Sequence, residues 1–548
     1  MTDITHPTPA PAFPGSHPVA KLTGSDMEVG NFISGFSDNR QTGFEISRLL
    51  LRKVDGVSTG TIAQSSRATE GTATAPGYYS QDWGRKFLLN GGCAYVDLNH
   101  LEICIPEVLS AHDHVAATHA MFRIAAQAGR DADRDLPDGF RTELMANNSD
   151  GFGNSYGTHL NFLISRQLWE DLFHRRVQCL LLLASFQASS ILLSGQGKVG
   201  VENGRPHVPY QISQRADFFE ILNGPQTTFN RPIVNSRDEA HCGARHGSPS
   251  DRLARLHVIF YDNNLCHAAM LLKVGTLQII LAMLETGWLD LNFIVDRPVA
   301  AVTTFSHDPD LTAKVAMLNG DSWSALDLQC RFLEAARRFV ASGRCGAAVP
   351  RAGEILDLWE DTLEQLRRRN FQALAPRLDW VLKRTLLEQA MRERGLSWGA
   401  PEIKYLDHLY SHLDPDRGLY WSMERSGFTQ QLVTEERIRQ LVSEPPEDTR
   451  AWTRAFFLRL TDPDLVEDVD WDRLEFRFPH LDHGRFHFRR LNLTLDDPLD
   501  HTSDRTRNRI PPSASLEQIV EALGGVEPSA DRAVATSHPD NPRSKGIA

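Results

Sequence analysis

The 548-residue sequence has no excess of basic residues, since 58 Lys and Arg stand against 70 Asp and Glu and the formal net charge is −12. Domains that bind nucleic acids carry a basic surplus, so we expect no nucleic-acid partner. The sequence also lacks an uninterrupted apolar run of membrane-spanning length. Its longest apolar stretch, 177–193, is broken by glutamines and serines. It predicts a buried helix, and we expect no membrane partner.

Cysteine is scarce and poorly placed for cross-linking. There are seven cysteines, an odd number, and no two stand at C-x-x-C spacing. This excludes a disulfide framework and a zinc ribbon, and it predicts a cytoplasmic location. The hydrophobic share of 41 % is that of a globular protein and excludes wholesale disorder.

Changes of composition divide the chain into a main domain and a smaller one. A Pro-rich polar start, a long Ser/Thr/Gly-rich stretch and a Pro/Ser/Asp-rich end flank or interrupt the periodic segments. We expect a disordered leader (1–21), a main domain (22–440) with a long mobile loop (52–87), a small C-terminal domain (441–525) and a disordered tail (526–548).

Helical spacing of apolar residues dominates beyond residue 324, over 355–366 and again over 378–386. We interpret these stripes as core packing. His112 and His114 flank an expected helix start, and we expect both on the surface.

The segment Gly24–Gly30 predicts a strand that carries two carboxylates. In a strand, alternate side chains share a face, so Asp26 and Glu28 lie together while Met27 and Val29 point into a core. Two neighbouring carboxylates repel unless a cation lies between them, and such oxygen ligands suit magnesium. The alternative is an exposed polar strand face.

A second strand is expected within Asn90–Glu102. Ala94, Val96 and Leu98 form an apolar face there, and the opposite face carries Tyr95, Asp97 and Asn99, with Glu102 just past the strand end. A carboxylate on a sheet face suits a nucleophile or general base. Solvated strand polarity is the alternative.

Further polar groups follow in a Gly-rich loop and in an arginine-containing region. The loop, Asn147–His159, runs into a strand and allows close backbone approach to a ligand, although an ordinary surface turn is equally open. Arg215, Arg237 and His257, the last in an expected strand over 256–262, could meet in one sheet-like region. Arginine forks match phosphate geometry, and structural ion pairing is the alternative for each arginine.

Taken together, these segments resemble the depupylase/Pup-ligase (Dop/PafA) family over most of residues 22–480. Several ordered motifs carry the resemblance. The family patterns and their positions here are G-x-E-x-E-(F/Y)-G (24–30), N-G-A-R-x-Y-x-D…H-P-E (90–102), N-N-x-D-x-x-G-x-S-Y-G-x-H-E-N (147–161), S-Q-R-A-(D/E) (213–218), R-P-I-I-N-T-R-D-E-P-H (231–241) and R-L-H-V-I (255–259).

The resemblance is greater to the depupylase branch. Asp97 and Glu102 are five positions apart, as in depupylases, whereas ligases have one extra residue there. The 52–87 segment stands where depupylases carry an additional loop. An amide ligase is therefore disfavoured.

The resemblance implies an α+β fold like that of glutamine synthetase and the carboxylate–amine ligases. In this fold a curved antiparallel sheet, packed with helices, cradles ATP or ADP, phosphate and Mg²⁺ (or Mn²⁺), beside a small C-terminal domain. It implies a catalytic aspartate at Asp97, phosphate-binding arginines at Arg215 and Arg237, and an adenine contact at Trp471. The implied metal ligands are Asp26, Glu28, Tyr95, Glu102, His159 and His257.

The expected activity is hydrolysis of a Pup-type isopeptide bond, with a Pup-like modifier or its conjugates as partner. Three departures from the family pattern stand out: Asp26 replaces Glu, Leu160 replaces the Glu of H-E-N, and His267 replaces a Glu. If Leu160 and His267 alter the acidic cradle, a phosphohydrolase or phosphotransferase acting on a nucleotide or other phosphorylated small molecule is the alternative. An inactive scaffold is least favoured, because all six implied metal positions keep side chains able to bind metal.

Overall fold

The computed structural model describes residues 17–35, 43–58, 83–238, 241–242 and 252–528. Within them, eight strands form the main sheet, in the order β12-β7-β1-β5-β4-β3-β2, with β6 pairing with β1 as well. Every pairing in this sheet is antiparallel. The strands are β1 (Thr23–Ser34), β2 (Val57–Ser58), β3 (Trp83–Phe87), β4 (Cys93–Asp97), β5 (His100–Cys104), β6 (Arg141–Met145), β7 (Thr158–Ser165) and β12 (Leu253–Val258).

The central strand β1 has different neighbours along its two edges. One edge pairs with β5, while the other pairs with β7 along its first half and with β6 along its second half. Met27 and Val29 are fully buried in the main core, and the alternate residues Asp26 and Glu28 are only half-buried. The alternation predicted for this strand is therefore confirmed.

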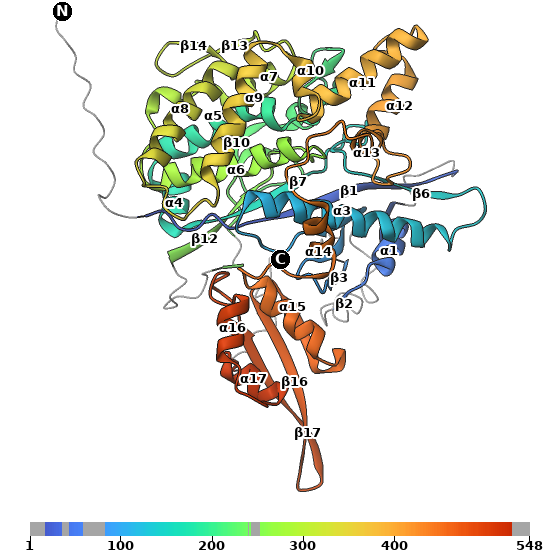
Figure 1. The fold of residues 1–548 in the computed structure, drawn as a ribbon, viewed down its shortest axis with the longest axis vertical. Helices are drawn as coiled ribbons and strands as arrows, with labels where there is room; N and C mark the ends of the chain where they lie inside the picture. Colours follow the sequence, from blue (N-terminus) through green and yellow to red (C-terminus); the bar gives the residue numbers. More distant parts are fainter. Residues whose placement is uncertain (1–16, 36–42, 59–82, 239–240, 243–251, 529–548) are drawn as a thin grey trace, which may run out of the picture.

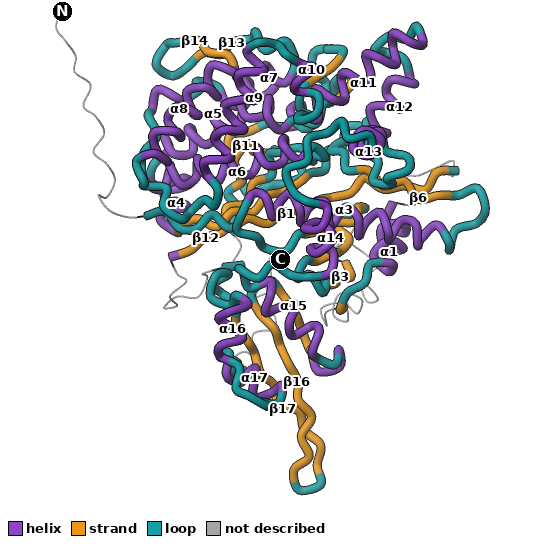
Figure 2. Tube along the Cα trace, viewed as in Figure 1, coloured by secondary structure: helices purple, strands orange, loops and turns teal. Residues whose placement is uncertain are grey.

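One face of the main sheet is covered by helices (Figures 1 and 2). The long helix α3 (Ala111–Asp133) begins at Ser110, whose hydroxyl accepts a hydrogen bond from the Asp113 amide and caps the helix. Two further helices are apolar: α5 (Val177–Ser194) packs against α6 (His267–Glu285), and α6 packs against α3. By length and composition both could cross a membrane, but they are 83 % and 100 % buried, as core helices of a folded domain are. The prediction of a buried helix over 177–193 is confirmed.

The remaining α-helices of the main domain complete this layer, and those from residue 298 onward extend the core. They are α1 (Gly43–Lys53), α4 (Arg166–Glu170), α7 (Pro298–Ser306), α8 (Ala325–Ala341), α9 (Ala352–Arg367), α10 (Phe371–Leu374), α11 (Asp379–Arg394), α12 (Pro401–Tyr410), α13 (Leu419–Arg425) and α14 (Glu435–Ser443). The apolar stripes predicted for 355–366 and 378–386 lie on α9 and α11 and face the core. His112 and His114 do begin α3, but both are buried, so their expected surface location was wrong.

In the described part of the chain, three two-stranded sheets lie outside the main sheet: β8 (Lys198–Val199) with β9 (Tyr210–Gln211), β10 (Ile221–Gly224) with β11 (Pro232–Asn235), and β13 (Lys314–Ala316) with β14 (Ser322–Ser324). The strand expected over 256–262 is β12, which begins three residues earlier and ends at Val258.

The C-terminal module has its own three-stranded sheet, β15 (Val466–Asp470), β16 (Arg473–Asp482) and β17 (Arg485–Thr494), with α15 (Ala451–Leu460), α16 (Ser503–Arg509) and α17 (Leu516–Ala522). In Figure 1 it lies below the main sheet, and the β16–β17 hairpin projects away from the body. Its core is continuous with Phe87, Cys93 and Cys104 of the main sheet.

The predicted leader, long loop and tail lie partly outside the described residues. The parts outside are residues 1–16 of the leader, 59–82 of the loop and 529–548 of the tail. Lys21, the last residue of the predicted leader, is fully buried and its ammonium lies 2.7 Å from the Glu285 carboxylate. Within the predicted loop (52–87), Arg52 and Lys53 still belong to α1, and the described ends beyond them form β2 and β3, which pair with each other. The loop is therefore shorter at both ends than predicted.

Candidate active site

A cavity of about 1870 Å³ lies against the main sheet and reaches the C-terminal module. All ten residues that the sequence singled out line it: Asp26, Glu28, Tyr95, Asp97, Glu102, His159, Arg215, Arg237, His257 and Trp471. They come from seven separate segments of the chain. The structure therefore brings the whole predicted set together, while the role of each residue stays a prediction.

Strand register explains how the acidic and histidine side chains meet. In the pairing of β1 with β7, Asp26 lies opposite His159, and in the pairing of β1 with β5, Glu28 lies opposite Glu102. Opposite residues of antiparallel strands project from the same face. Tyr95 of β4 is also opposite Glu102, and its hydroxyl donates a 2.6 Å hydrogen bond to the Glu102 carboxylate.

The segment Asn90–Glu102 differs from the single strand predicted for it. It is a hairpin in which β4 ends at Asp97 and β5 begins at His100, with Leu98 and Asn99 as the two-residue turn. Leu98 is 46 % exposed and has φ 50°, so it does not belong to the apolar face. Glu102 lies within β5, not beyond a strand end. The tight turn places Asp97 and Glu102 side by side on the cavity face.

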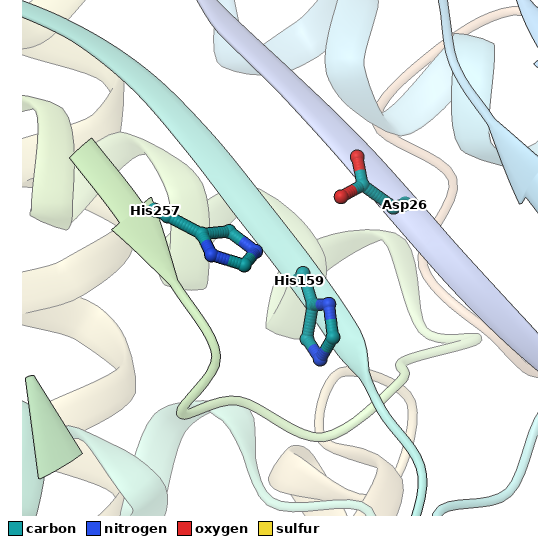
Figure 3. Close-up of side chains that lie close together, drawn as sticks. All are labelled: Asp26, His159 and His257. Atoms are coloured by element: carbon teal, nitrogen blue, oxygen red, sulfur yellow. The ribbon is translucent and has the colours of Figure 1, made fainter. Parts of the chain in front are cut away.

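Two groups of three side chains in the cavity have ligand atoms within 4.8 Å of one another. One consists of Asp26, His159 and His257, which Figure 3 shows on three neighbouring strands. Burial, together with nearby arginines, holds the pKa of both histidines well below the ordinary value, so the imidazoles are neutral and able to bind a cation. Asn161 donates a 2.8 Å hydrogen bond to Asp26 and accepts one of 2.6 Å from Arg255, which fixes the carboxylate.

The second group consists of Glu28, Asp97 and Glu102. Burial and the neighbouring Asp97 carboxylate raise the pKa of Glu28 to about 8. Burial and the surrounding carboxylates raise the pKa of Glu102 well above its usual value. Glu102 is buried and the other two carboxylates are half-buried. Three carboxylates this close together repel one another as anions but can bind one cation together, so this donor set fits Mg²⁺ or Mn²⁺.

Arg215 supplies positive charge to the same cavity from a fully enclosed position, with 1 % of its surface exposed. One guanidinium nitrogen donates to the Ile259 carbonyl at 2.9 Å. Its Nε and its Nη1 have no partner among the described residues. Burial lowers the pKa of Arg215 to about 9, which leaves it cationic at neutral pH. Nε and Nη1 of this buried cation could therefore donate hydrogen bonds to an anionic group of a ligand.

Gly157 makes room for this arginine. A Cβ atom at Gly157 would lie 2.2 Å from Arg215 Nη1 and 2.7 Å from its Cζ. No side chain fits there unless the guanidinium moves. The glycine of the predicted Gly-rich loop therefore has a specific task, which is to admit Arg215 to the cavity.

A second buried arginine, Arg231, was not proposed from the sequence although its motif was noted. It lines the cavity, and its guanidinium donates to the carbonyls of Thr227 and Ser155, both at 2.9 Å. Arg237 lines the cavity as well and is half-buried, with its amide bonded to the Asn235 side chain at 3.0 Å.

Trp471 comes to the cavity from the C-terminal module, between β15 and β16. Its ring packs edge-on against Phe87 at 5.3 Å, and the Arg454 guanidinium lies 4.8 Å from the ring centre. Arg454 and Arg450 both bind the buried Glu107 carboxylate, at 2.6 Å and 2.8 Å. Glu107 was not found from the sequence. It joins the module to the main sheet and so holds Trp471 in place.

Two departures from the family pattern lie elsewhere than expected. Leu160 is fully buried in the main core, because it alternates with His159 along β7 and faces away from the cavity. His267 begins α6 and is not among the cavity-lining residues. The expectation that these two residues change the acidic cradle was therefore wrong.

Comparison with known proteins agrees with this geometry. The family model described as "Pup-ligase protein" matches residues 33–475. The chain belongs to the Pup-ligase family. It is 37 % identical over 440 residues to the depupylase of Acidothermus cellulolyticus, covering 80 % of this chain and 83 % of the relative. It is 35 % identical over 409 residues to the Pup–protein ligase of Micrococcus luteus, covering 72 % and 84 %. The family thus contains enzymes that act on Pup in two ways.

Solved structures of Pup-ligase family members share the fold. The ligase PafA in complex with Pup superposes with a TM-score of 0.71 at 24 % identity, over 95 % of this chain and 98 % of that one. PafA in complex with ADP superposes with a TM-score of 0.66 at 25 % identity, over 89 % and 94 %. The predicted glutamine synthetase-like α+β fold is confirmed.

Proposed function

We propose that this protein is a depupylase-like hydrolase that cleaves the isopeptide bond between the C-terminal glutamate of a Pup-like modifier and a lysine. The observation that carries the proposal is the position of Asp97. It closes a two-residue turn that sets it beside Glu28 and Glu102, in the cavity that Arg215 lines. Asp97 and Glu102 are five positions apart, which is the spacing that resembles depupylases. The additional residue found in ligases would lengthen the turn between β4 and β5.

The chain's own residues support a hydrolytic sequence. The Asp97 carboxylate attacks the scissile carbonyl carbon or removes a proton from a water molecule that does so. In the first route an Asp97 oxygen becomes bonded to the glutamyl carbon as the C–N bond breaks and a proton from water passes to the lysine nitrogen; a water molecule then cleaves this anhydride and restores both carboxyl groups. In the second route the water oxygen becomes bonded to that carbon, the C–N bond breaks, and Asp97 passes the proton it took to the lysine nitrogen. Mg²⁺ held by Glu28 and Glu102 would supply positive charge as negative charge develops on the carbonyl oxygen.

Arg215 and Trp471 support a nucleotide-binding role for the same cavity. Nε and Nη1 of Arg215 are free to donate to a phosphate, and the Trp471 ring offers an aromatic surface to adenine. ATP or ADP with phosphate is therefore the proposed cofactor set. The PafA relative solved with ADP supports this assignment. All seven cysteines are free thiols, which supports a cytoplasmic location.

Three reactions measured side by side test the proposal. The purified chain receives a Pup–lysine isopeptide conjugate with ATP and Mg²⁺, or free Pup with a lysine-containing acceptor, ATP and Mg²⁺, or a panel of nucleotides alone. We expect cleavage of the conjugate and no net formation of new conjugate. Conjugate formation coupled to ATP consumption would make the protein a ligase. Phosphate release with the conjugate intact would make it a phosphohydrolase, and no reaction in any arm would support a scaffold role.

A further inference from the structure

A third group of possible metal ligands lies away from the cavity, between α3, α6 and α13. It consists of His119, His267 and Glu424, whose ligand atoms lie within 4.8 Å of one another. The two imidazole rings are 4.4 Å apart at their centres, and both are buried. None of the three residues lines the cavity. The proposed hydrolysis gives them no task.

His119 is held in the tautomer that a metal ligand needs. Its Nε2 lies 3.0 Å from the Leu265 carbonyl oxygen, and a carbonyl only accepts, so Nε2 carries the ring hydrogen. The lone pair of the neutral ring is therefore on Nδ1. A backbone carbonyl that orients one imidazole nitrogen while the other binds the ion is the usual support of a metal-binding histidine.

His267 has a polar atom that nothing satisfies. The ring is fully buried, and Nε2 has no hydrogen-bond partner among the described residues. A buried polar atom in that state costs free energy unless a ligand meets it. The Leu432 amide donates to Nδ1 over a long 3.2 Å contact, so without a cation Nε2 carries the ring hydrogen and is a buried donor that lacks an acceptor in the described part of the chain. Binding of a cation at Nε2 moves the ring hydrogen to Nδ1, so this contact opens and the backbone at Leu432 shifts.

Charges around the group also favour a divalent cation. Glu424 is half-buried and supplies a carboxylate to the group. The nearby Arg123 is neutralised by Glu435, which receives two hydrogen bonds of 2.6 Å from its guanidinium. With two neutral imidazoles, two carboxylates and one guanidinium, the group has one net negative charge.

We infer that His119, His267 and Glu424 form a zinc site that ties α3, α6 and α13 together. Two imidazole nitrogens and one carboxylate oxygen are a common zinc donor set, with water in the fourth position. Zinc–ligand distances of about 2.0–2.2 Å place neighbouring ligands about 3.3 Å apart, so the group contracts on binding. Glu424 is the least buried of the three and makes most of this movement.

Zinc titration of the full chain tests the site. The metal-stripped protein is titrated with Zn²⁺ in excess Mg²⁺, in a His159→Gln background that weakens zinc binding in the cavity. We expect one tightly bound zinc in this parent. His267→Gln and Glu424→Gln should each weaken that binding at least about 10-fold. Zinc should raise the unfolding temperature of the parent and leave that of these two variants unchanged.

Matched controls keep the experiment decisive. His112→Gln changes another histidine of α3, and Glu436→Gln changes an exposed glutamate of α14; both should bind zinc like the parent. Equal zinc uptake by the parent and the two site variants would overturn the proposal, as would absence of uptake by the parent. If His267→Gln does not fold, the half-exposed Glu424→Gln still gives the answer. Since His267 and Glu424 lie outside the cavity, isopeptide cleavage is expected to survive both substitutions.

Discussion

Replacing Gly157 by alanine tests whether the enclosed Arg215 binds an anionic group of the substrate or nucleotide. The new Cβ would lie 2.2 Å from Nη1, far inside van der Waals contact, so the guanidinium must leave its present position. Its surroundings give it little freedom, because it is 1 % exposed and bonded to the Ile259 carbonyl. The displaced arginine can no longer present Nε and Nη1 to the cavity.

The expected loss follows from the hydrogen bonds at stake. A hydrogen bond to a charged group contributes about 1.5–3 kcal/mol. Loss of one such bond weakens binding about 10- to 150-fold, since each 1.4 kcal/mol is a factor of about ten. Binding of ATP to the variant and the wild type, measured by titration calorimetry in the presence of Mg²⁺, gives the ratio directly.

Gly24→Ala is the matched control. Gly24 lines the same cavity, and a Cβ there meets no atom within 4 Å. It should bind ATP like the wild type. The reasoning about Arg215 is refuted if a folded Gly157→Ala protein, with an unfolding temperature near that of wild type, binds ATP within twofold of it.

Three further predictions concern the metal groups and the C-terminal module. Because the folded-state pKa of Glu28 is raised from 4.5 to about 8, the metal-free protein should lose stability as pH rises through this interval. Mg²⁺ should therefore raise the unfolding temperature more at pH 8 than at pH 5. An equal rise at both pH values would contradict the interpretation of the Glu28, Asp97 and Glu102 group as a cation site. Glu107→Gln should lower the free energy of unfolding in urea by about 3–5 kcal/mol, because the buried Arg450 and Arg454 lose their carboxylate partner. Glu444→Gln, at the exposed ion pair with Arg459, should lower it by less than about 1 kcal/mol. The pKa of Glu107 is held at about 2 by these arginines in spite of burial, so its contribution should be present above pH 4.5 and vanish as pH falls toward 2. Asn161→Ala should weaken Mn²⁺ binding about 10- to 100-fold in calorimetry, since it frees the Asp26 carboxylate, and unchanged affinity would rule out that positioning role.

Strand alternation made most of the site predictable. The pattern of Gly24–Gly30 places Asp26 and Glu28 on one face whatever the partner strands are, and the structure has them there. The same rule, applied to β7, would have shown that Leu160 faces away from His159. The resemblance to a known family joined segments that periodicity alone leaves unrelated in space.

Other features depend on tertiary contacts that no local pattern reveals. Leu98 continues the apolar alternation of its segment, and only the hairpin, with φ 50° at a leucine, interrupts it. Glu107 meets Arg454 across 347 residues of sequence, so its role follows from docking of the C-terminal module. Arg231 and Asn161 lay within quoted motifs, but their hydrogen-bond partners are visible only in the fold.

The central claim is that Asp97 carries out isopeptide hydrolysis in the carboxylate-lined cavity. The most direct measurement is the rate of cleavage of a Pup–lysine conjugate, with ATP and Mg²⁺, by wild type, Asp97→Asn and the exposed control Asp138→Asn. The account predicts that wild type and Asp138→Asn cleave the conjugate at equal rates and that Asp97→Asn is at least about 100-fold slower. Cleavage by Asp97→Asn at the wild-type rate, in a protein that still binds ATP, would contradict it.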